Sequence, residues 1–347
     1  MLPLRVSGVP DGWQVRVPVL GDVAQLVSLI AGSAQAAVGS SAVDSEAVLS
    51  EAVGVASWTR RQLVVVDLGE RVRAWVRVHD RAAGRTVVEV TVDPALTDDG
   101  LARGLFGWAE AVAVEVTRQR QLTATQLDAS AYAGDERQRG WLGRAGYRHT
   151  RTWLQMSRPV GPVEARPGAL PPVRPGVLVR PVASHENGLP VAGDLQTVHQ
   201  LLEESFADHF NSYRESFPEF LQRLREDPGH RWDHWWIATV EVDGVEVPAG
   251  AVVSSVLPAD DSGVEGSYID YIGVHRRARG RGVAKALIYT VIADAARRGR
   301  NRVGLEVDAD SPTGADALYA SMGWRVRYRT ESWHRTVEVP KAQPPSR

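Results

Sequence analysis

The residues with the clearest chemical potential form a glycine- and arginine-rich segment in the second half of the chain. It reads Ile272-Gly273-Val274-His275-Arg276-Arg277-Ala278-Arg279-Gly280-Arg281-Gly282-Val283-Ala284-Lys285. A strand is expected to end at Val274, and apolar residues at helical spacing follow the glycines. Backbone amides at a helix N-terminus have no partner within the helix, and the helix dipole adds partial positive charge. The segment is therefore a candidate pyrophosphate-binding loop.

Several kinds of phosphate site could account for this loop. A Walker P-loop requires Ser or Thr directly after its Lys, but Lys285 is followed by Ala286. A dinucleotide fingerprint requires a third glycine at the position that Lys285 occupies. The remaining pattern, Arg/Gln-x-x-Gly-x-Gly/Ala, is met from Arg279 to Ala284. A nucleic-acid patch is also compatible with four Arg in six residues, but the charge around them is balanced.

Together with a later motif, this loop resembles the GNAT superfamily of acetyl-CoA-dependent N-acetyltransferases. The six residues from Arg279 to Ala284 match the superfamily's phosphate-binding motif. They follow an expected β-meander and precede the motif Leu318-Tyr319-x-x-x-Gly323-Trp324. The resemblance covers Val177 to Val339 well and roughly Val15 to Val160 more faintly.

The resemblance implies roles for individual residues. Loop amides would bind the CoA pyrophosphate, and the strand that carries Ile272 and Val274 would offer main-chain hydrogen bonds to pantetheine. Tyr319 would protonate the leaving CoA thiolate, and His275 is expected to be a loop residue rather than a catalyst. Ser311 stands where a similar stretch of the family often has Asn. The implied acetyl-CoA contacts are Ile272, Val274, Arg279, Gly280, Arg281, Gly282, Val283, Ala284, Lys285 and Ser311.

Proton transfer supplies the other candidate catalytic residues. An amine attacks a thioester only when it is neutral, so an acceptor of high pKa needs a general base. Asp270 and Glu306 lie on expected neighbouring strands, near the point where these strands would separate, and are the candidate bases. Each could instead be a solvated carboxylate at a strand edge, because alternation alone does not decide which face a side chain takes. Tyr319 is the candidate acid, and packing against the sheet is its structural alternative.

Acceptor-site candidates come from the helical region between Val198 and Arg225. Aromatic and polar residues interrupt it, and in the superfamily this connection usually borders the acceptor. The candidate acceptor-binding residues are therefore His209, Phe210 and Tyr213. No metal-ligand spacing appears among the nine His, so no metal is expected.

Hydrophobic patterning predicts the elements that position these residues in the second half. Helical spacing is found over Asp194–Phe210, Phe217–Arg225, Gly280–Arg298 and Gly314–Met322. Strand patterns are found over Gly176–Val182, Trp235–Val242, Ala249–Leu257, Tyr268–Val274, Arg302–Val307 and Trp324–Thr330. Asp243-Gly244 indicates a hairpin turn. The helix after the loop should turn five residues inward, namely Val283, Leu287, Ile288, Val291 and Ile292.

The first half shows the same order of patterns. Helices are expected over Val19–Ala31, Asp44–Val53, Gly100–Val116 and Asp135–Ala145, and strands over Gln14–Val17, Gln62–Leu68, Val72–His79, Thr86–Val92, Leu122–Leu127 and Tyr147–Met156. A repeat of this size indicates two copies of one domain. The predicted fold is α+β, with two tandem GNAT-like domains that each contain a mixed, mostly antiparallel sheet flanked by helices. The expected ranges are 1–158 for a degenerate domain, 159–176 for a proline-rich linker, 177–340 for the catalytic domain and 341–347 for a flexible tail.

The first copy has lost the residues that suit it to CoA. When Val92 is aligned with Val274, Thr97-Asp98-Asp99-Gly100-Leu101-Ala102 occupies the place of the loop motif. Two carboxylates stand where phosphates would bind, which disfavours an anionic ligand. Leu142 takes the place of Tyr319 and has no proton to donate. The first domain is therefore predicted to be catalytically silent.

Composition limits the remaining possibilities. The chain has 347 residues, which is about right for two domains, and a formal net charge of -2, which disfavours a dedicated nucleic-acid binder. It contains no Cys, which excludes disulfides, thiolate metal sites and a covalent acetyl-cysteine route. Neither a signal peptide nor a membrane span is expected, so a cytoplasmic location without a membrane partner is the default. The sequence leaves monomer and homodimer open.

The sequence thus predicts direct transfer of an acetyl group from acetyl-CoA to the amine of a small molecule, with the active site in the second domain. One alternative is acetylation of the amine of a thiol precursor, since the family includes a tandem enzyme of that kind. Another is a non-catalytic protein that binds or senses acyl-CoA. The intact loop together with Tyr319 favours an enzyme.

Overall fold

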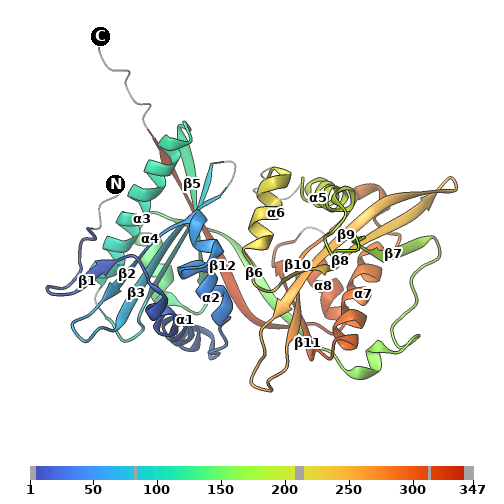
Figure 1. Ribbon diagram of the computed structural model, residues 1–347, viewed down its shortest axis with the longest axis horizontal. Helices are drawn as coiled ribbons and strands as arrows, with labels where there is room; N and C mark the ends of the chain where they lie inside the picture. Colours follow the sequence, from blue (N-terminus) through green and yellow to red (C-terminus); the bar gives the residue numbers. More distant parts are fainter. Residues whose placement is uncertain (1–4, 82–83, 98, 208–214, 312–313, 340–347) are drawn as a thin grey trace, which may run out of the picture. The chain divides into compact units, whose positions relative to one another are not determined.

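The computed structural model describes residues 5–81, 84–97, 99–207, 215–311 and 314–339, and these form two compact units (Figure 1). The first unit holds the chain up to Leu154, together with Asp308–Asp310 and the segment that starts at Tyr328. The second unit holds residues 155–307 and 311–327. Each unit is a sheet with helices packed against it, as the sequence predicts.

The sheet of the first unit has the strand order β1-β2-β3-β4-β5-β12, and β12 is followed by the beginning of β6. Its strands are β1 (Gln14–Arg16), β2 (Arg60–Val66), β3 (Val72–Arg81), β4 (Arg85–Val92), β5 (Ala124–Tyr132), β6 (Arg148–Pro159) and β12 (Arg325–Glu338). β4 and β5 are parallel, whereas β5 and β12 are antiparallel. The helices are α1 (Val23–Val38), α2 (Ser45–Ala52), α3 (Asp99–Gln119) and α4 (Glu136–Arg144).

The second unit repeats this plan, with the order β6-β11-β10-β9-β8-β7 starting from the end of β6. Its other strands are β7 (Val177–Pro181), β8 (His230–Val242), β9 (Val245–Leu257), β10 (Gly266–Val274) and β11 (Arg302–Asp308). β10 and β11 are the parallel pair, and β7, β8, β9 and β10 form an antiparallel meander. The helices are α5 (Ala192–Phe206), α6 (Phe217–Arg225), α7 (Val283–Arg297) and α8 (Ala315–Ser321). The α+β prediction with mostly antiparallel sheets is confirmed.

Two glycines show which helices cover which face of the second sheet. A Cβ on Gly273 of β10 would meet Leu202 and Ser205 of α5. A Cβ on Gly250 of β9 would meet side chains of α7. Gly250 pairs with Val274, the residue after Gly273. Because successive residues of a strand point to opposite faces, a Cβ on Gly250 and a Cβ on Gly273 would lie on opposite sides of the sheet. Helix α5 therefore lies on one face and α7 on the other.

Each face has its own apolar core. On the α7 face, the five residues predicted to turn inward are all buried, namely Val283, Leu287, Ile288, Val291 and Ile292. On the α5 face, α6 contributes Phe220 and Leu224 to a cluster with Trp235 and Val253. The apolar face of each helix thus packs against the apolar side chains that alternate along the strands, and this packing forms the layers that hold the site.

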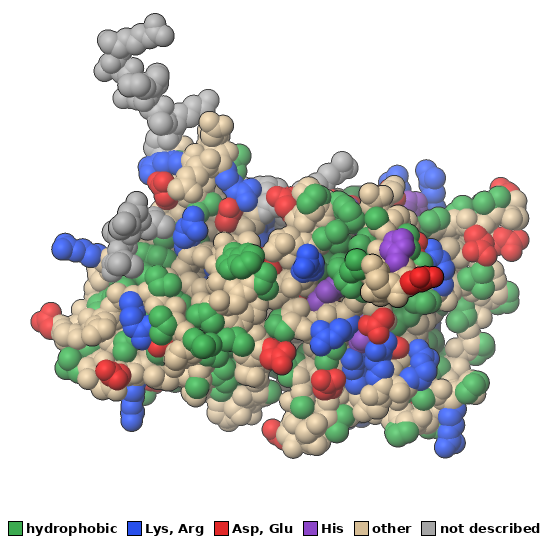
Figure 2. All heavy atoms as spheres, viewed as in Figure 1, with side chains coloured by type: hydrophobic (Ala, Val, Ile, Leu, Met, Phe, Trp, Pro, Cys, Tyr) green, Lys and Arg blue, Asp and Glu red, His purple; other side chains and the backbone are tan. Residues whose placement is uncertain are grey.

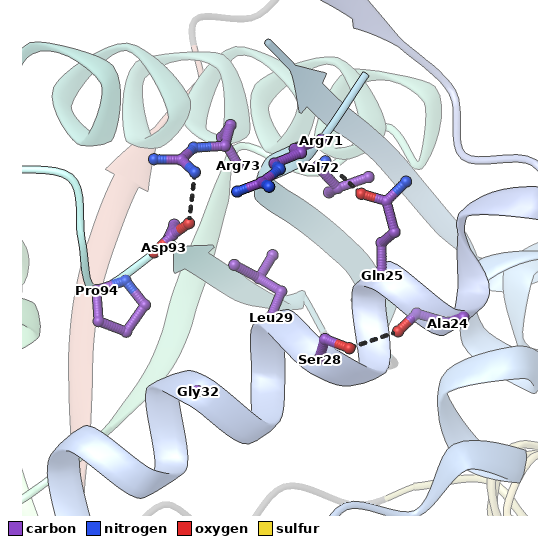
Figure 3. Close-up of a pocket in the computed structure, with 10 residues that line it drawn as sticks. All are labelled: Ala24, Gln25, Ser28, Leu29, Gly32, Arg71, Val72, Arg73, Asp93 and Pro94. Atoms are coloured by element: carbon purple, nitrogen blue, oxygen red, sulfur yellow. Dashed lines mark hydrogen bonds and ion pairs between the residues drawn. The ribbon is translucent and has the colours of Figure 1, made fainter. Parts of the chain in front are cut away.

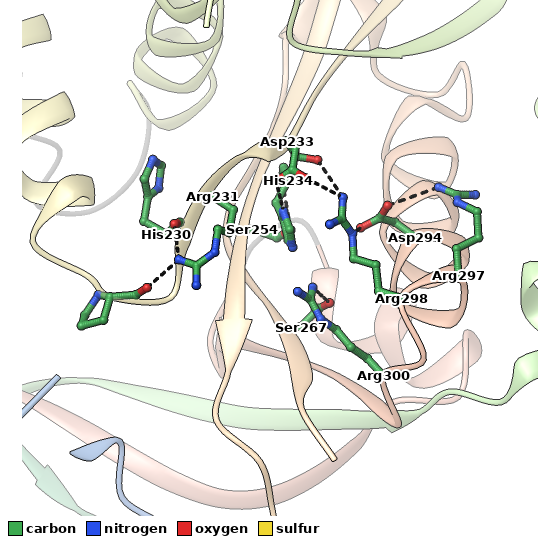
Figure 4. Close-up of polar contacts among 11 residues, drawn as sticks. His230, Arg231, Asp233, His234, Ser254, Ser267, Asp294, Arg297, Arg298 and Arg300 are labelled. Carbon is green, nitrogen blue, oxygen red and sulfur yellow. Dashed lines mark hydrogen bonds and ion pairs between the residues drawn. The ribbon is translucent and has the colours of Figure 1, made fainter. Parts of the chain in front are cut away.

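Strand β8 contains a long irregularity that is fastened to the end of α7. His230 pairs with Ser255, but the next pair is Trp235 with Val253, so β8 has extra residues between them. Figure 4 shows how polar contacts hold this segment: Asp233 binds His234 and accepts a hydrogen bond from Arg298, which also binds Asp294. Burial lowers the pKa of His234. These polar contacts join the bulge to the C-terminal end of α7.

The structure shows two features of the chain's course that the sequence did not predict. Strand β12 is longer than the expected strand, and its residues from Thr330 to Glu338 pair with β5 of the first unit. The last strand thus packs outside the unit that holds the remainder of the predicted catalytic domain. The proline-rich segment also contains a short 3-10 helix, Pro162–Ala165, which packs near α7.

The molecular surface carries charges of both signs. In the face shown in Figure 2, Lys and Arg side chains are interspersed with Asp and Glu. This distribution agrees with the small net charge of the sequence. Within the described ranges, no helix has the length and hydropathy needed to cross a membrane.

Candidate active site

The loop between β10 and α7 presents a row of open backbone amides. A short 3-10 turn, Arg276–Ala278, follows β10, and Gly280 and Gly282 then take left-handed φ angles of 79° and 89°. Glycine suits both positions because other residues are strained there. Among the described residues, no acceptor binds the amides of Gly280, Gly282, Val283, Ala284 and Lys285. With the dipole of α7, this geometry can hold a pyrophosphate.

The parallel strands β10 and β11 separate immediately before two carboxylates. They are paired only at Ser267–Val303, Tyr268–Gly304 and Ile269–Leu305. Asp270 directly follows Ile269 on β10, and Glu306 directly follows Leu305 on β11. A register shift in the β9–β10 ladder also falls between Ile269 and Tyr271, so Asp270 lies on a bulge. The structure therefore places both predicted bases at the separation of the strands, as expected.

The carboxyl group of Asp270 has the properties of a base near neutral pH. Burial and the nearby Asp227 raise its pKa to about 7, although the hydroxyl of Ser255 and the positive charge of Arg223 lower it. Ser255 Oγ donates to Asp270 Oδ1 at 3.2 Å. A carboxyl with such a pKa can accept a proton from an ammonium group or from a water. Asp270 is thus the stronger of the two candidates.

Glu306 belongs to a second polar row on the same face. Gln155 Nε2 donates to Glu306 Oε2 at 2.8 Å, and the hydroxyl of Tyr268 lies 3.5 Å from Gln155 Oε1. Tyr268 pairs with Ser255, the residue that binds Asp270. The polar groups around Glu306 therefore lie next to those around Asp270. Burial raises the pKa of Glu306 and the Gln155 bond lowers it. The Glu306 side chain is exposed to solvent.

A neutral histidine lies beyond Ser255 on this face. His230 pairs with Ser255 across β8 and β9, and burial lowers the pKa of His230 to about 4. Its ring packs edge-on against Trp232, with the ring centroids 4.4 Å apart. His230 therefore adds no positive charge beside Asp270 at neutral pH.

Tyr319 lies on α8, the helix that follows β11. Its side chain is buried, its ring centroid is 5.8 Å from that of Trp324, and burial raises its pKa to about 12. Within the described ranges, no hydrogen bond joins its hydroxyl to another protein group. A phenol with this pKa is protonated at neutral pH, so it can donate a proton but cannot act as a base.

The other predicted residues are located as follows. Ile272 and Val274 lie on the part of β10 that no longer pairs with β11, where main-chain groups of that edge are available to a ligand. Arg279, Arg281 and Lys285 are exposed around the loop. The carbonyl of Ser311 accepts a hydrogen bond from Gly314 N at 3.1 Å, just before α8. The acceptor-site candidates His209, Phe210 and Tyr213 lie outside the described residues.

The face of β10 that carries Asp270 has a polar group that the sequence did not indicate. Arg223 of α6 forms a two-point ion pair with Glu215, and its Nη1 donates to the hydroxyl of Tyr271 at 2.7 Å. Tyr271 follows Asp270 directly. Arg223 thereby fixes one wall beside the candidate base. In the sequence, the one signal for this position of Arg223 is that it precedes Leu224, a residue of the apolar face of α6.

The first unit lacks the corresponding open loop. At the start of α3, Gly8 lies against Gly100 and Ser7 lies against Gly104. They are so close that a Cβ on Gly8 or on Gly104 would collide with the backbone of the other segment. Asp99 accepts hydrogen bonds from Trp141 Nε1 and Arg144 Nη2. Leu142, at the position of Tyr319, is completely buried. These features favour the prediction that the first unit is silent.

The first unit contains a pocket of about 380 Å³ between α1 and the start of β3 (Figure 3). Its polar lining includes Arg71, Arg73 and Asp93, and Arg73 Nη1 lies 3.1 Å from Asp93 Oδ2. Leu29 and Val72 provide an apolar wall. None of the residues predicted to bind acetyl-CoA or the acceptor lines this pocket.

The chain is similar in sequence to known acetyltransferases. Residues 195–324 match the family model described as Acetyltransferase (GNAT) family. The chain is 29% identical over 311 residues to a mycothiol acetyltransferase from Nocardioides sp., a match that covers 85% of this chain and 93% of the relative.

Solved structures share the fold over nearly the whole chain. A GCN5-related N-acetyltransferase from Sphaerobacter thermophilus has a TM-score of 0.73 at 24% identity, with 95% of this chain and 97% of that chain covered. A tandem GNAT protein from the clavulanic acid biosynthesis pathway has a TM-score of 0.66 at 17% identity, with 95% and 100% covered. Both have the two-domain length of this protein. The stretch from residue 195 to residue 324, which includes the glycine-rich loop and Tyr319, is thus similar to acetyltransferases of the GNAT family.

Proposed function

We propose that this protein transfers an acetyl group from acetyl-CoA to the amine of a small molecule, and that the reaction takes place in the second unit. The observation that carries this proposal is the position of Asp270. It lies on a bulge where β10 leaves β11, with a pKa of about 7, on the strand that leads into the open amides of the loop. The first unit then serves as support, because its own loop position is covered by Ser7 and Gly8.

The chain offers a binding group for each part of the donor. The amides of Gly280, Gly282, Val283, Ala284 and Lys285 would hold the pyrophosphate. Exposed Arg279 and Arg281 would add charge. The free edge of β10 at Ile272 and Val274 would pair with the amide groups of pantetheine, as a strand pairs with a neighbour. Ser311 would contact the donor beside α8.

The proposed reaction is direct transfer. The amine nitrogen attacks the thioester carbonyl as its proton passes to Asp270, through a water where the two are not in contact. A carbon–nitrogen bond forms and the carbon–sulfur bond breaks, and the CoA thiolate takes a proton from Tyr319. The Tyr319 phenolate then regains a proton from solvent, and Asp270 releases to solvent the proton that it accepted. The products are the acetylated amine and CoA thiol. Main-chain N–H groups at the bulge are suited to the developing oxyanion.

A thiol-release assay with a panel of amines tests this function. Turnover of acetyl-CoA that depends on a particular amine supports an acetyltransferase. Acetyl-CoA binding with no turnover for any amine supports the alternative of a sensor. Mycothiol precursors belong in the panel because the curated relative is a mycothiol acetyltransferase. A small-molecule acceptor with several hydroxyl groups would find polar partners in Ser255, Tyr268 and Gln155.

Replacing Tyr319 by Phe is expected to lower kcat about 10- to 100-fold while acetyl-CoA affinity stays within about twofold. The buried hydroxyl supplies a proton to the leaving thiolate and has no structural partner in the described part of the chain. The measurement is steady-state kinetics beside calorimetric binding. Tyr289→Phe on α7 is the matched control and should keep full activity. Full activity in Tyr319→Phe would show that another group is the acid.

Replacing Ser255 by Ala is expected to move the acidic limb of the pH–rate profile to higher pH. The base must be ionised to act, and the Ser255 hydroxyl stabilises its ionised form. Loss of this bond raises the pKa of Asp270, so the limb should move up by about 0.5 to 1 pH unit. The rate on the alkaline plateau should be retained. An unchanged limb would mean that Asp270 is not the group that titrates.

A further inference from the structure

Outside the predicted loop, Arg174 is the residue in closest contact with the glycines of the candidate phosphate site. It belongs to the segment that leads into β7. Its Nη1 donates to the carbonyl oxygen of Gly280 at 2.9 Å. Its aliphatic stem covers Gly282: a Cβ on Gly282 would lie 2.8 Å from Arg174 Cδ. The side chain therefore lies along both left-handed glycines of the loop.

The arginines of the loop itself are not held in this way. Arg281 Nη1 points to the carbonyl of Glu241, at 3.3 Å, in the β8–β9 hairpin. Arg276, Arg277 and Arg279 are exposed, and their guanidinium groups make no hydrogen bond or ion pair within the described ranges. Arg174 likewise has no carboxylate partner among the described residues, and only one of its five N–H groups is engaged by the protein. One hydrogen bond thus holds Arg174 at the loop, and its other N–H groups remain available to a ligand.

In the first unit, backbone instead of a side chain lies at the position that corresponds to that of Arg174. The segment before β1 lies on the start of α3, where Gly8 lies against Gly100 and Ser7 lies against Gly104. Gly100 corresponds to Gly282 in the internal repeat. In the first unit, main chain lies against the helix start. In the second unit, a flexible side chain with a positive charge covers it instead.

We propose that Arg174 is a phosphate-binding residue of the acetyl-CoA site, supplied by the proline-rich segment. This inference rests on the proposed function of the second unit. The Gly280 carbonyl holds the guanidinium beside the open amides, and its remaining N–H groups bind a pyrophosphate oxygen. Guanidinium is suited to this role because its planar donors match two phosphate oxygens. The proline-rich segment is then part of the binding site rather than only a spacer.

The test compares Arg174→Ala with the wild-type protein and with Arg166→Ala, an exposed arginine of the same segment. Calorimetry with acetyl-CoA should show Kd raised about 5- to 20-fold for Arg174→Ala and unchanged for Arg166→Ala. Arg174→Lys should fall between wild type and Arg174→Ala, because it keeps the charge but loses the planar fork. In steady-state assays KM for acetyl-CoA should rise and kcat should be retained.

A donor without phosphates isolates the contact. S-acetylpantetheine lacks the pyrophosphate, so its Kd should be the same for wild type and Arg174→Ala. Equal acetyl-CoA affinity in wild type and Arg174→Ala would overturn the role of Arg174 and leave the proposed function intact. An equal loss with both donors would also overturn it, because the effect would then be on the fold of the loop. No binding of acetyl-CoA by the wild-type chain would overturn the proposed function and this inference together.

Discussion

Replacing Asp270 by Asn is expected to lower kcat about 10²- to 10⁴-fold and, at the same time, to stabilise the folded protein at pH 8. The carboxylate is the proposed base, and the amide cannot accept the proton. The measurements are steady-state kinetics and chemical unfolding across a range of pH.

The stability effect follows from the raised pKa. Folding moves the pKa of Asp270 from its ordinary value of 3.8 to about 7, so the folded protein binds this proton more tightly than the unfolded chain. As pH rises from about 4 to about 7, wild type therefore loses stability that the Asn variant retains. Above pH 7, the Asn variant should exceed wild type by about 2 to 4 kcal/mol in the free energy of unfolding. The upper end follows from about 1.4 kcal/mol for each unit by which folding raises the pKa.

Asp261→Asn is the matched control, since Asp261 is an exposed carboxylate in the same unit. It should change neither kcat nor the pH dependence of stability. An Asp270→Asn variant that keeps wild-type activity would remove Asp270 from the mechanism. An Asp270→Asn variant that is no more stable than wild type above pH 7 would show that folding does not raise the pKa of this carboxyl.

Replacing Gly282 by Asp is expected to weaken acetyl-CoA binding by at least about 100-fold. The φ angle of Gly282 is 89°, where a side chain is strained, and a Cβ would collide with Arg174. The new carboxylate would also repel the pyrophosphate among the loop amides. Calorimetric titration with acetyl-CoA measures the loss.

Gly263→Asp separates the loss of binding from the loss of stability. Gly263 has a similar φ of 74° in the turn before β10, but a Cβ there would meet open space. Both substitutions introduce the same side chain at a left-handed position, so they should have comparable backbone cost. Gly263→Asp should bind acetyl-CoA normally. Retained binding in Gly282→Asp would show that the phosphates lie elsewhere.

The sequence was sufficient to predict the layers of the fold and the place of the loop. Helix α7 shows a clear stripe of apolar residues, and all five predicted members are buried. The two glycines of the loop occupy the left-handed positions that their residue type favours. Both signals are local, because a short stretch of chain determines them.

Contacts between distant segments could not be predicted in the same way. The bulge at Asp270 depends on the register of β9, and the residue that binds its carboxyl, Ser255, lies on that other strand. Strand alternation is compatible with several registers, so the facing of Asp270 was open. The contact of Arg174 with Gly280 joins residues 106 positions apart. A proline-rich composition indicates an extended path but not where that path leads.

The last strand illustrates the same limit. Residues 330–338 of β12 have a strand pattern that would suit a sheet of either unit, and they pair with β5. Likewise, the chemical character of Thr97 to Ala102 predicted a poor phosphate site, but not that Ser7 and Gly8 would cover the start of α3. Pairing of distant segments is decided by tertiary packing rather than by local pattern.

Calorimetric titration of the full-length protein with acetyl-CoA tests most directly the claim that one half of the chain carries the chemistry. We expect one site per chain in the wild-type protein and none in Gly282→Asp. Two equal sites per chain, or one site that survives in Gly282→Asp, would contradict the assignment of the active site to the second unit.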